Sequence, residues 1–278
     1  MIRAQIRPVV STMTLAHDRT GSGPPIVLLH PLGADRRVWD GVVGPLVAAG
    51  HQVIAVDLPG FGDSPPLPMD ERPTPVAIAH AVAGFLGVEE IDAATVVGNS
   101  LGGWVALELG LVSAAGSVVA IAPAGLWPAP LAPRRSVARF LSRVGRPLVG
   151  PATRTATGRR LLLGGAVARP ELVPAQAAAR LIRSYASAPD FPRVNAAMRA
   201  ADPFRRLEEI AVPVTLVWPE RDTVVDRPRR LPSQIESIVL PQAGHIPMLE
   251  APEAVAALLV RVAAATAGRR SARPPAAR

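Results

Sequence analysis

TVVGNSLGG, at residues 95–103, joins a short apolar run to a helical pattern through the pentapeptide Gly98-Asn99-Ser100-Leu101-Gly102. Gly-x-Ser-x-Gly between a strand and a helix is the sequence form of a nucleophile elbow, a tight turn that holds a serine in a strained, exposed conformation. Glycines on either side of Ser100 remove side chains that would collide with nearby backbone as the turn tightens. The pentapeptide alone is a weak signal. Its meaning depends on whether the chain also supplies a histidine, an acid and an oxyanion hole.

Short apolar runs alternate with helical patterns along most of the chain. Glycine or proline bounds several of these runs, as is typical of buried strands, and they occupy residues 25–30, 52–57, 118–122 and 213–218. Helical patterns lie between them, for example at residues 76–86 and after Ser100. This alternation predicts an α/β fold with a mostly parallel central sheet flanked by helices.

The alternation lapses between residues 125 and 201, where Pro-rich joints separate helical pieces. An interruption of about 75 residues is too long for an ordinary loop. We expect a helical cap inserted over the strand ends, where parallel sheets bind ligands. Residues 1–124 and 202–266 would form the core domain, residues 125–201 the cap, and the Arg/Pro/Ala-rich residues 267–278 a disordered basic tail.

The net charge of +8 comes entirely from arginine, because the chain has no lysine. Thirteen of its 30 basic residues lie between Ala129 and Ala200, against only two acids, Glu171 and Asp190. Such asymmetry can indicate nucleic-acid binding or an anionic membrane surface. No aromatic-rich or Gly/Ser-rich nucleic-acid motif accompanies the charge, so we expect solvated arginines and no nucleic-acid partner. Attraction of an anionic substrate is a second interpretation.

Composition also bears on compartment and cofactors. The longest uncharged window, residues 109–133, contains four prolines, so we expect no membrane span. The first eight residues lack the apolar core of a signal peptide, and the absence of cysteine excludes thiol chemistry. We therefore expect a cytoplasmic protein with no cofactor and no metal; composition leaves its oligomeric state open.

A serine hydroxyl needs an adjacent base, itself oriented by a third group. Of five histidines, His245 follows the last strand and precedes the last helix, where a parallel-sheet enzyme builds its site. The acid should lie between serine and histidine in chain order. Glu220, Asp222 and Asp226 all follow the strand that ends at Trp218. We favour Asp222, because it falls only a few residues past the strand end.

The oxyanion formed by attack on a carbonyl needs N–H donors. Leu101 supplies one at the start of a helix, where the macrodipole also favours an anion. The second should come from the loop after the first central strand, which begins His30-Pro31. Proline has no N–H, so we expect Leu32 to donate, with Gly33 as the alternative. His30 could act as a base, but we favour a structural role in fixing this loop.

Together these motifs resemble the α/β-hydrolase fold family over roughly residues 8–265. The matching stretches are LLH at residues 28–30, DLPGFGDS at 57–64, GNSLGG at 98–103, Trp218 through Asp222, and Gly244-His245. The resemblance implies a capped serine hydrolase whose Ser-Asp-His triad is Ser100, Asp222 and His245, with oxyanion donors at Leu32 and Leu101. Pro31 and Pro219 depart from the pattern, because the family usually has glycine at the first position and often at the second.

The resemblance implies hydrolysis of a small ester, lactone or C–C (diketone-type) substrate through an acyl-enzyme on Ser100. A cofactor-free perhydrolase or acyltransferase would use the same triad, and a non-catalytic hydrolase-like binding protein is a third reading. Serine at position 100 argues against the epoxide-hydrolase and haloalkane-dehalogenase branches, which have aspartate there. The expected partner is a small-molecule substrate, whose identity the cap lining would decide.

Overall fold

The computed structural model describes residues 13–127 and 146–271. Its centre is a seven-stranded sheet in the order β1-β3-β2-β4-β5-β6-β7. β1 pairs antiparallel to β3, and every other neighbouring pair is parallel. The strands are β1 (His17–Thr20), β2 (Pro25–Leu29), β3 (Gln52–Val56), β4 (Thr95–Asn99), β5 (Ser117–Ile121), β6 (Val214–Pro219) and β7 (Glu236–Leu240). This confirms the predicted α/β class and the mostly parallel sheet.

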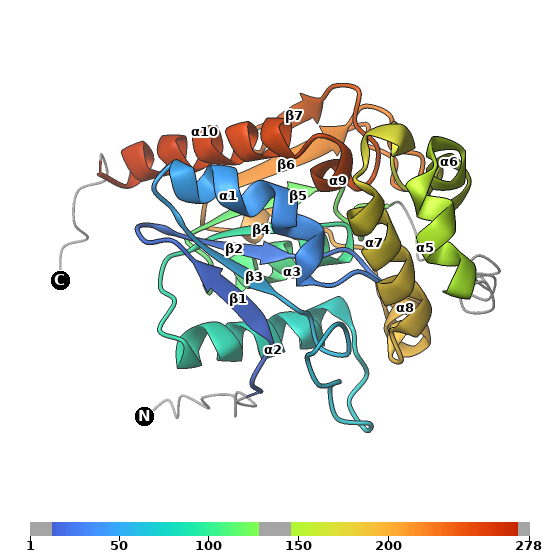
Figure 1. Cartoon of the computed structure of the whole chain (residues 1–278). Coiled ribbons are helices and arrows are strands. Elements are labelled where there is room, and N and C mark those ends of the chain that lie inside the picture. The colour runs from blue at the N-terminus through green and yellow to red at the C-terminus, as the bar shows by residue number, and fades with distance from the viewer. Residues whose placement is uncertain (1–12, 128–145, 272–278) are drawn as a thin grey trace, which may run out of the picture.

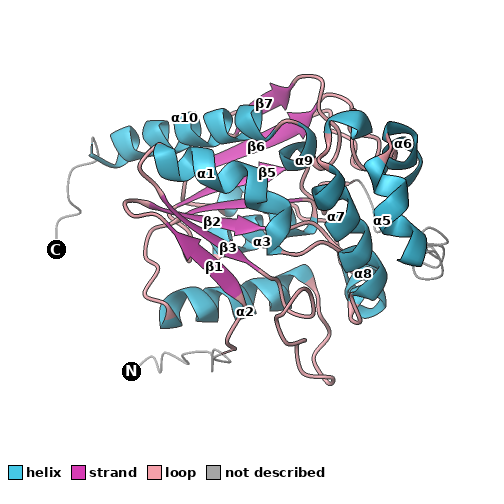
Figure 2. Cartoon of the chain, viewed as in Figure 1, coloured by secondary structure: helices cyan, strands magenta, loops and turns pink. Residues whose placement is uncertain are grey.

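Helices cover both faces of the sheet, as Figures 1 and 2 show. The core helices are α1 (Asp40–Ala48), α2 (Pro75–Val88), α3 (Leu101–Leu111), α9 (Pro247–Glu250) and α10 (Pro252–Ser271). Short 3₁₀ turns occupy Arg36–Trp39, Pro170–Leu172 and Leu207–Glu209. Alternate strand residues enter opposite layers: Val27 packs with α2 and α3, whereas Leu28 packs with α1 and α10. Strands buried on both faces explain the unbroken apolar runs in the sequence.

Between β5 and β6, the described residues form four helices. They are α5 (Arg146–Arg154), α6 (Ala156–Leu163), α7 (Ala175–Ser187) and α8 (Phe191–Ala200), and we call them the helical insert. Figure 1 places the helical insert at the end of the sheet toward which the parallel strands point. Ligands of parallel sheets bind at this end. The first part of the predicted cap, residues 128–145, lies outside the described residues.

The C-terminal helix is longer than the sequence suggests. We expect a tail from residue 267, but α10 continues to Ser271. Alanine and arginine dominate this stretch and are strong helix formers, so one internal glycine at 268 does not end the helix. The remainder of the predicted tail lies outside the described residues. Among the described helices, none is both long and apolar enough to cross a bilayer.

The turn from β4 into α3 depends on two glycines. A Cβ on Gly98 would lie 1.9 Å from the Gly102 carbonyl oxygen, and one on Gly102 would lie 2.4 Å from the Leu29 carbonyl oxygen. Both distances are far below contact between non-bonded atoms. The chain can therefore reverse from strand to helix against the end of β2 only where these Cβ atoms are missing.

We predict that Gly98→Ala lowers the free energy of unfolding by at least about 3 kcal/mol, because the methyl group overlaps fixed backbone. Gly87→Ala is the matched control: Gly87 lies in α2 with no atom within 4 Å of its Cβ position. That change should raise the free energy of unfolding by up to about 1 kcal/mol through helix propensity. Urea denaturation of both variants measures the difference, and equal stabilities would contradict the prediction.

Candidate active site

Ser100 occupies the turn between β4 and α3 in a strained backbone conformation. Its φ of 55° and ψ of −114° lie outside the usual regions for a side-chain-bearing residue. Backbone hydrogen bonds hold it there: its N–H donates to the Ile121 carbonyl at 2.9 Å, and its carbonyl accepts from Trp104 and Ala124. The residue is 8% exposed. The predicted elbow therefore has the geometry that its sequence indicates.

His245 and Asp222 meet at the ends of β7 and β6. The His245 Nδ1 atom lies 2.8 Å from Asp222 Oδ2, and both side chains are buried. The other carboxylate oxygen, Oδ1, accepts the backbone N–H groups of Val224 and Val225 at 2.7 and 3.1 Å. These donors fix the Asp222 carboxylate, so it presents one oxygen to the imidazole. Asp222, the acid that spacing from the strand end favours, is therefore the carboxylate that contacts His245.

The two competing acids lie elsewhere. Glu220 Oε2 accepts the backbone N–H of Gln242 at 2.8 Å, which ties the loop after β6 to the loop after β7. Asp226 makes no ion pair or hydrogen bond to another described residue. Neither carboxylate is bonded to His245.

Asn99 joins the elbow to the histidine loop. Its side-chain Nδ2 donates to the His245 carbonyl at 3.0 Å and to the Ile121 carbonyl at 3.1 Å, and the residue is fully buried. Asn99 directly precedes Ser100, so this amide fixes the backbone that carries the serine relative to the backbone that carries the histidine. The sequence motif leaves position 99 unspecified, which is why sequence reasoning missed this contact.

The two expected oxyanion donors, Leu32 and Leu101, lie near the place where α3 contacts the end of β2. Gly102 lies against the carbonyls of Leu29 and His30. Leu101 is therefore close to the loop that contains Leu32. Within the described residues, no hydrogen bond engages the N–H of Leu101 or Leu32. Leu101 is the first residue of α3, where an N–H has no partner inside the helix.

His30 is a buried structural residue between two backbone groups. Its Nε2 accepts the Leu58 N–H at 2.9 Å, which requires a lone pair, so the proton lies on Nδ1 and is donated to the Pro31 carbonyl at 2.8 Å. Burial lowers the pKa of His30, and the nearby Asp57 carboxylate only partly opposes this shift. Both ring nitrogens hold loops in place, as the structural reading of His30 expects.

Glu250 is a functional candidate that the sequence analysis did not single out. This buried carboxylate accepts three backbone N–H groups: Gly244 at 2.6 Å, Ala168 at 3.2 Å and Arg169 at 2.6 Å. A backbone bond from Ile246 N–H to the Ala166 carbonyl, 2.9 Å long, runs beside it. The loop of His245 and the loop after α6 are therefore fastened to one carboxylate. The available sequence signal was an acid in an otherwise apolar turn, Pro-Met-Leu-Glu.

A hollow of about 210 Å³ opens beside the histidine loop. It is lined by His245, Arg221, Thr223, Gly244 and the insert residues 164–168. Most of these residues are glycine or alanine, and among the described residues of the wall Arg221 carries the single formal charge. In the described part of the chain, no three His, Cys, Asp or Glu side chains gather as a metal site would require.

We predict that the unfolding free energy falls as pH drops below about 6.5, because the unfolded His30 then takes up a proton that the folded residue resists. The contribution of one such histidine approaches about 1.4 kcal/mol per pH unit. His30→Gln keeps an acceptor for Leu58 but cannot titrate, so its loss of stability between pH 6.5 and 5 should be smaller. Parallel slopes in urea denaturation would contradict this.

We predict that Glu250→Ala lowers the free energy of unfolding by about 3 kcal/mol, because one buried and two partly buried N–H groups lose their acceptor. Glu253→Ala is the control, since Glu253 is an exposed acid three residues further along. Its effect should stay within about 1 kcal/mol, the scale of a charge near a helix N-terminus. Urea denaturation gives both values. Similar losses in the two variants would show that the Glu250 contacts contribute little.

Comparison with known proteins agrees with this geometry. The model of the alpha/beta hydrolase family matches residues 26–258. Over 111 residues the chain is 40% identical to a 2-hydroxy-6-oxo-6-phenylhexa-2,4-dienoate hydrolase of Burkholderia cepacia, a segment that spans only 38% of each protein. It is 33% identical over 180 residues to the epoxide hydrolase EphH of Mycobacterium tuberculosis, covering 59% of this chain and 83% of that protein.

Among solved structures, a thermophilic esterase from Thermogutta terrifontis has a similar fold. It superposes with a TM-score of 0.68 at 22% identity, over 91% of this chain and 93% of the esterase. Because the family model covers most of the chain, this chain belongs to the alpha/beta hydrolase family.

Proposed function

We propose that this chain is an esterase-like serine hydrolase with Ser100 as nucleophile, His245 as base and Asp222 as the orienting acid. The observation that carries the proposal is the 2.8 Å contact from His245 Nδ1 to Asp222 Oδ2, on a loop that Asn99 ties to the elbow. A carboxylate at Nδ1 holds the proton there and leaves Nε2 as the basic nitrogen. The backbone of Ser100 combines a positive φ with a ψ of −114°, and this strained combination supports its role as nucleophile, because such strain clusters at functional sites.

In the proposed reaction, His245 Nε2 takes the Ser100 hydroxyl proton while Oγ attacks the substrate carbonyl. The negative charge that develops on oxygen is stabilised by the N–H groups of Leu32 and Leu101. His245 then protonates the leaving group, and the C–O or C–C bond breaks to give an acyl-enzyme. Water activated by His245 releases the acid and regenerates Ser100.

The proposed substrate is a small ester, lactone or vinylogous diketone. Support for the carbon–carbon reaction comes from the curated relative named as a dienoate hydrolase, and support for esters from the esterase fold match. The same triad could pass the acyl group to peroxide or an alcohol. Product analysis with competing acceptors would separate perhydrolysis and acyl transfer from hydrolysis. A purely binding role is disfavoured because serine, acid and histidine are all present.

We further propose that residues 125–201 act as a cap over this site. Three contacts support this role. Ala166 and Ala168 bond to the histidine loop and to Glu250, and Ser184 of α7 donates to the Asp35 carboxylate in the oxyanion loop region. Tyr185 and Phe191 also lie against Gly33, where a Cβ would come within 2.6 Å of the Tyr185 ring. A cap seated in this way would shape the acyl pocket.

Ser100→Ala should leave the fold intact and lower turnover by roughly four to six orders of magnitude. Ser113→Ala is a matched control, because Ser113 lies beyond the opposite end of α3 with a similar φ of 57°. The control should hydrolyse p-nitrophenyl esters at the parent rate. A fluorophosphonate probe should label the parent and Ser113→Ala but not Ser100→Ala. Equal labelling of the parent and both variants would contradict the proposal.

A further inference from the structure

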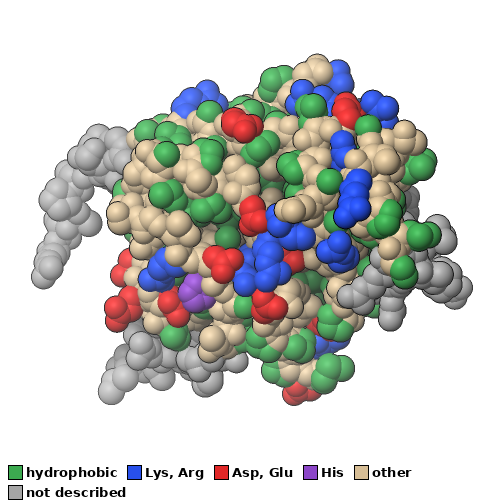
Figure 3. All heavy atoms as spheres, in the orientation of Figure 1, with side chains coloured by type: hydrophobic (Ala, Val, Ile, Leu, Met, Phe, Trp, Pro, Cys, Tyr) green, Lys and Arg blue, Asp and Glu red, His purple; other side chains and the backbone are tan. Residues whose placement is uncertain are grey.

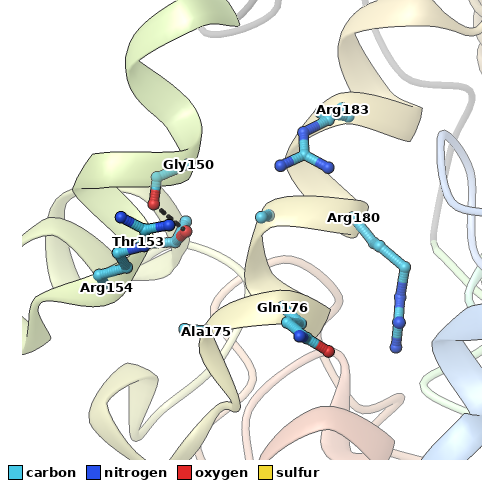
Figure 4. Close-up of a pocket in the computed structure, with 8 residues that line it drawn as sticks. Gly150, Thr153, Arg154, Ala175, Gln176, Arg180 and Arg183 are labelled. Carbon is cyan, nitrogen blue, oxygen red and sulfur yellow. Dashed lines mark hydrogen bonds between the residues drawn. The ribbon is translucent and has the colours of Figure 1, made fainter.

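A second hollow, of about 410 Å³, lies between α5 and α7 of the helical insert (Figure 4). Three arginines line it, Arg154 from α5 and Arg180 and Arg183 from α7, together with Thr153 and Gln176. No acidic residue is among the described residues on its wall. None of these residues belongs to the proposed triad or oxyanion hole. Figure 3 shows basic side chains gathered over this part of the molecule.

Most other arginines of the insert are engaged by the fold itself. Arg159 donates to three backbone carbonyls, of Thr153, Pro170 and Glu171. Arg160 pairs with the Glu171 carboxylate, and Arg193 pairs with Asp190 and donates to carbonyls of the loop at residues 67–71. Their positive charge is therefore matched by acceptors within the protein.

Arg154 and Arg183 differ from these arginines. Within residues 13–127 and 146–271, neither guanidinium has a hydrogen bond or an ion pair. Arg183 leaves α7 toward α5, so that its Nη2 lies 3.8 Å from where a Cβ on Gly150 would be. Arg180 instead extends away from the hollow and pairs with Asp40 at 2.8 Å. Two unmatched guanidinium groups thus face one hollow from its two sides.

The N-terminus of α7 contributes a further electropositive group. Pro174 precedes the helix, and no side chain caps its first N–H groups. Ala175 and Gln176, in the first turn of this 13-residue helix, line the same hollow. Free N–H groups and the helix dipole favour an anion at such a position. This feature is independent of the arginine side chains, and it belongs to the same wall of the hollow as Arg183.

We propose that the α5–α7 hollow is a binding site for a phosphate-bearing anion, separate from the hydrolytic centre. Guanidinium groups bind phosphate through paired N–H donors, and a diphosphate has enough oxygens to bind two guanidinium groups at once. A hollow of this volume falls within the range of small-ligand sites. The proposal does not depend on the chemistry of Ser100.

Isothermal titration of the full chain with inorganic pyrophosphate tests the site. Arg183→Gln and Arg154→Gln should each weaken binding by about tenfold, because each removes a charge-assisted pair of donors. Arg160→Gln is the matched control: it removes one exposed insert arginine that already pairs with Glu171, and pyrophosphate affinity should be unchanged. Circular dichroism should be the same for all four proteins, since the substituted side chains are exposed.

Three results would overturn the proposal. The first is no binding to the parent protein at millimolar pyrophosphate. The second is an equal loss of affinity in Arg160→Gln and Arg183→Gln, which would reveal attraction to the net charge of the insert and no defined site. The third is unchanged affinity in both Arg154→Gln and Arg183→Gln. Turnover of Ser100→Ala has no bearing on any of these readouts, so this proposal and the hydrolase proposal fail separately.

Discussion

The missing side chains at Gly98 and Gly102 are the constraint on which the rest of the structure depends. With no Cβ at either position, the end of β4, the start of α3 and the end of β2 approach within backbone contact. That approach sets the positive φ of Ser100 and places the first N–H of α3 beside the loop after β2. Strand order brings Asp222 and His245 to the edge of the sheet where Ser100 lies, because β6 and β7 lie on the same side of β4 as β5 and end at that edge.

Buried polar groups then fix loops that no regular structure holds. His30 bridges Leu58 and Pro31, Asn99 bridges the elbow and the histidine loop, and Glu250 gathers three N–H groups from two segments. Each is a fully or almost fully buried residue whose bonds run to backbone. Removing such a partner leaves a buried donor or acceptor without compensation, so these contacts hold the loops more firmly than exposed ion pairs would.

Local sequence predicted the elements well because their signals are local. Apolar runs bounded by glycine and proline predicted the central strands. Chain order left three acids as candidates, and spacing from the strand end favoured Asp222, whose carboxylate contacts His245. The contacts of Asn99 and Glu250 could not be predicted, since their partners are backbone groups as far as 146 residues away. The end of α10 was missed because Arg-rich composition indicates disorder and helix alike. The catalytic roles of Ser100, Asp222 and His245 stay predictions, as do the oxyanion roles of Leu32 and Leu101.

The bonds among Glu250, Gly244 and Ala168 have a mechanical consequence. The loop after α6 and the loop of His245 are bonded to each other and to Glu250. Outward movement of this end of the insert would therefore displace His245 as well. Movement of the insert relative to the core is therefore expected to be smallest at this corner. Exchanging the insert would shift the loop of His245 unless the new segment kept the backbone donors that Ala168 and Arg169 supply to Glu250.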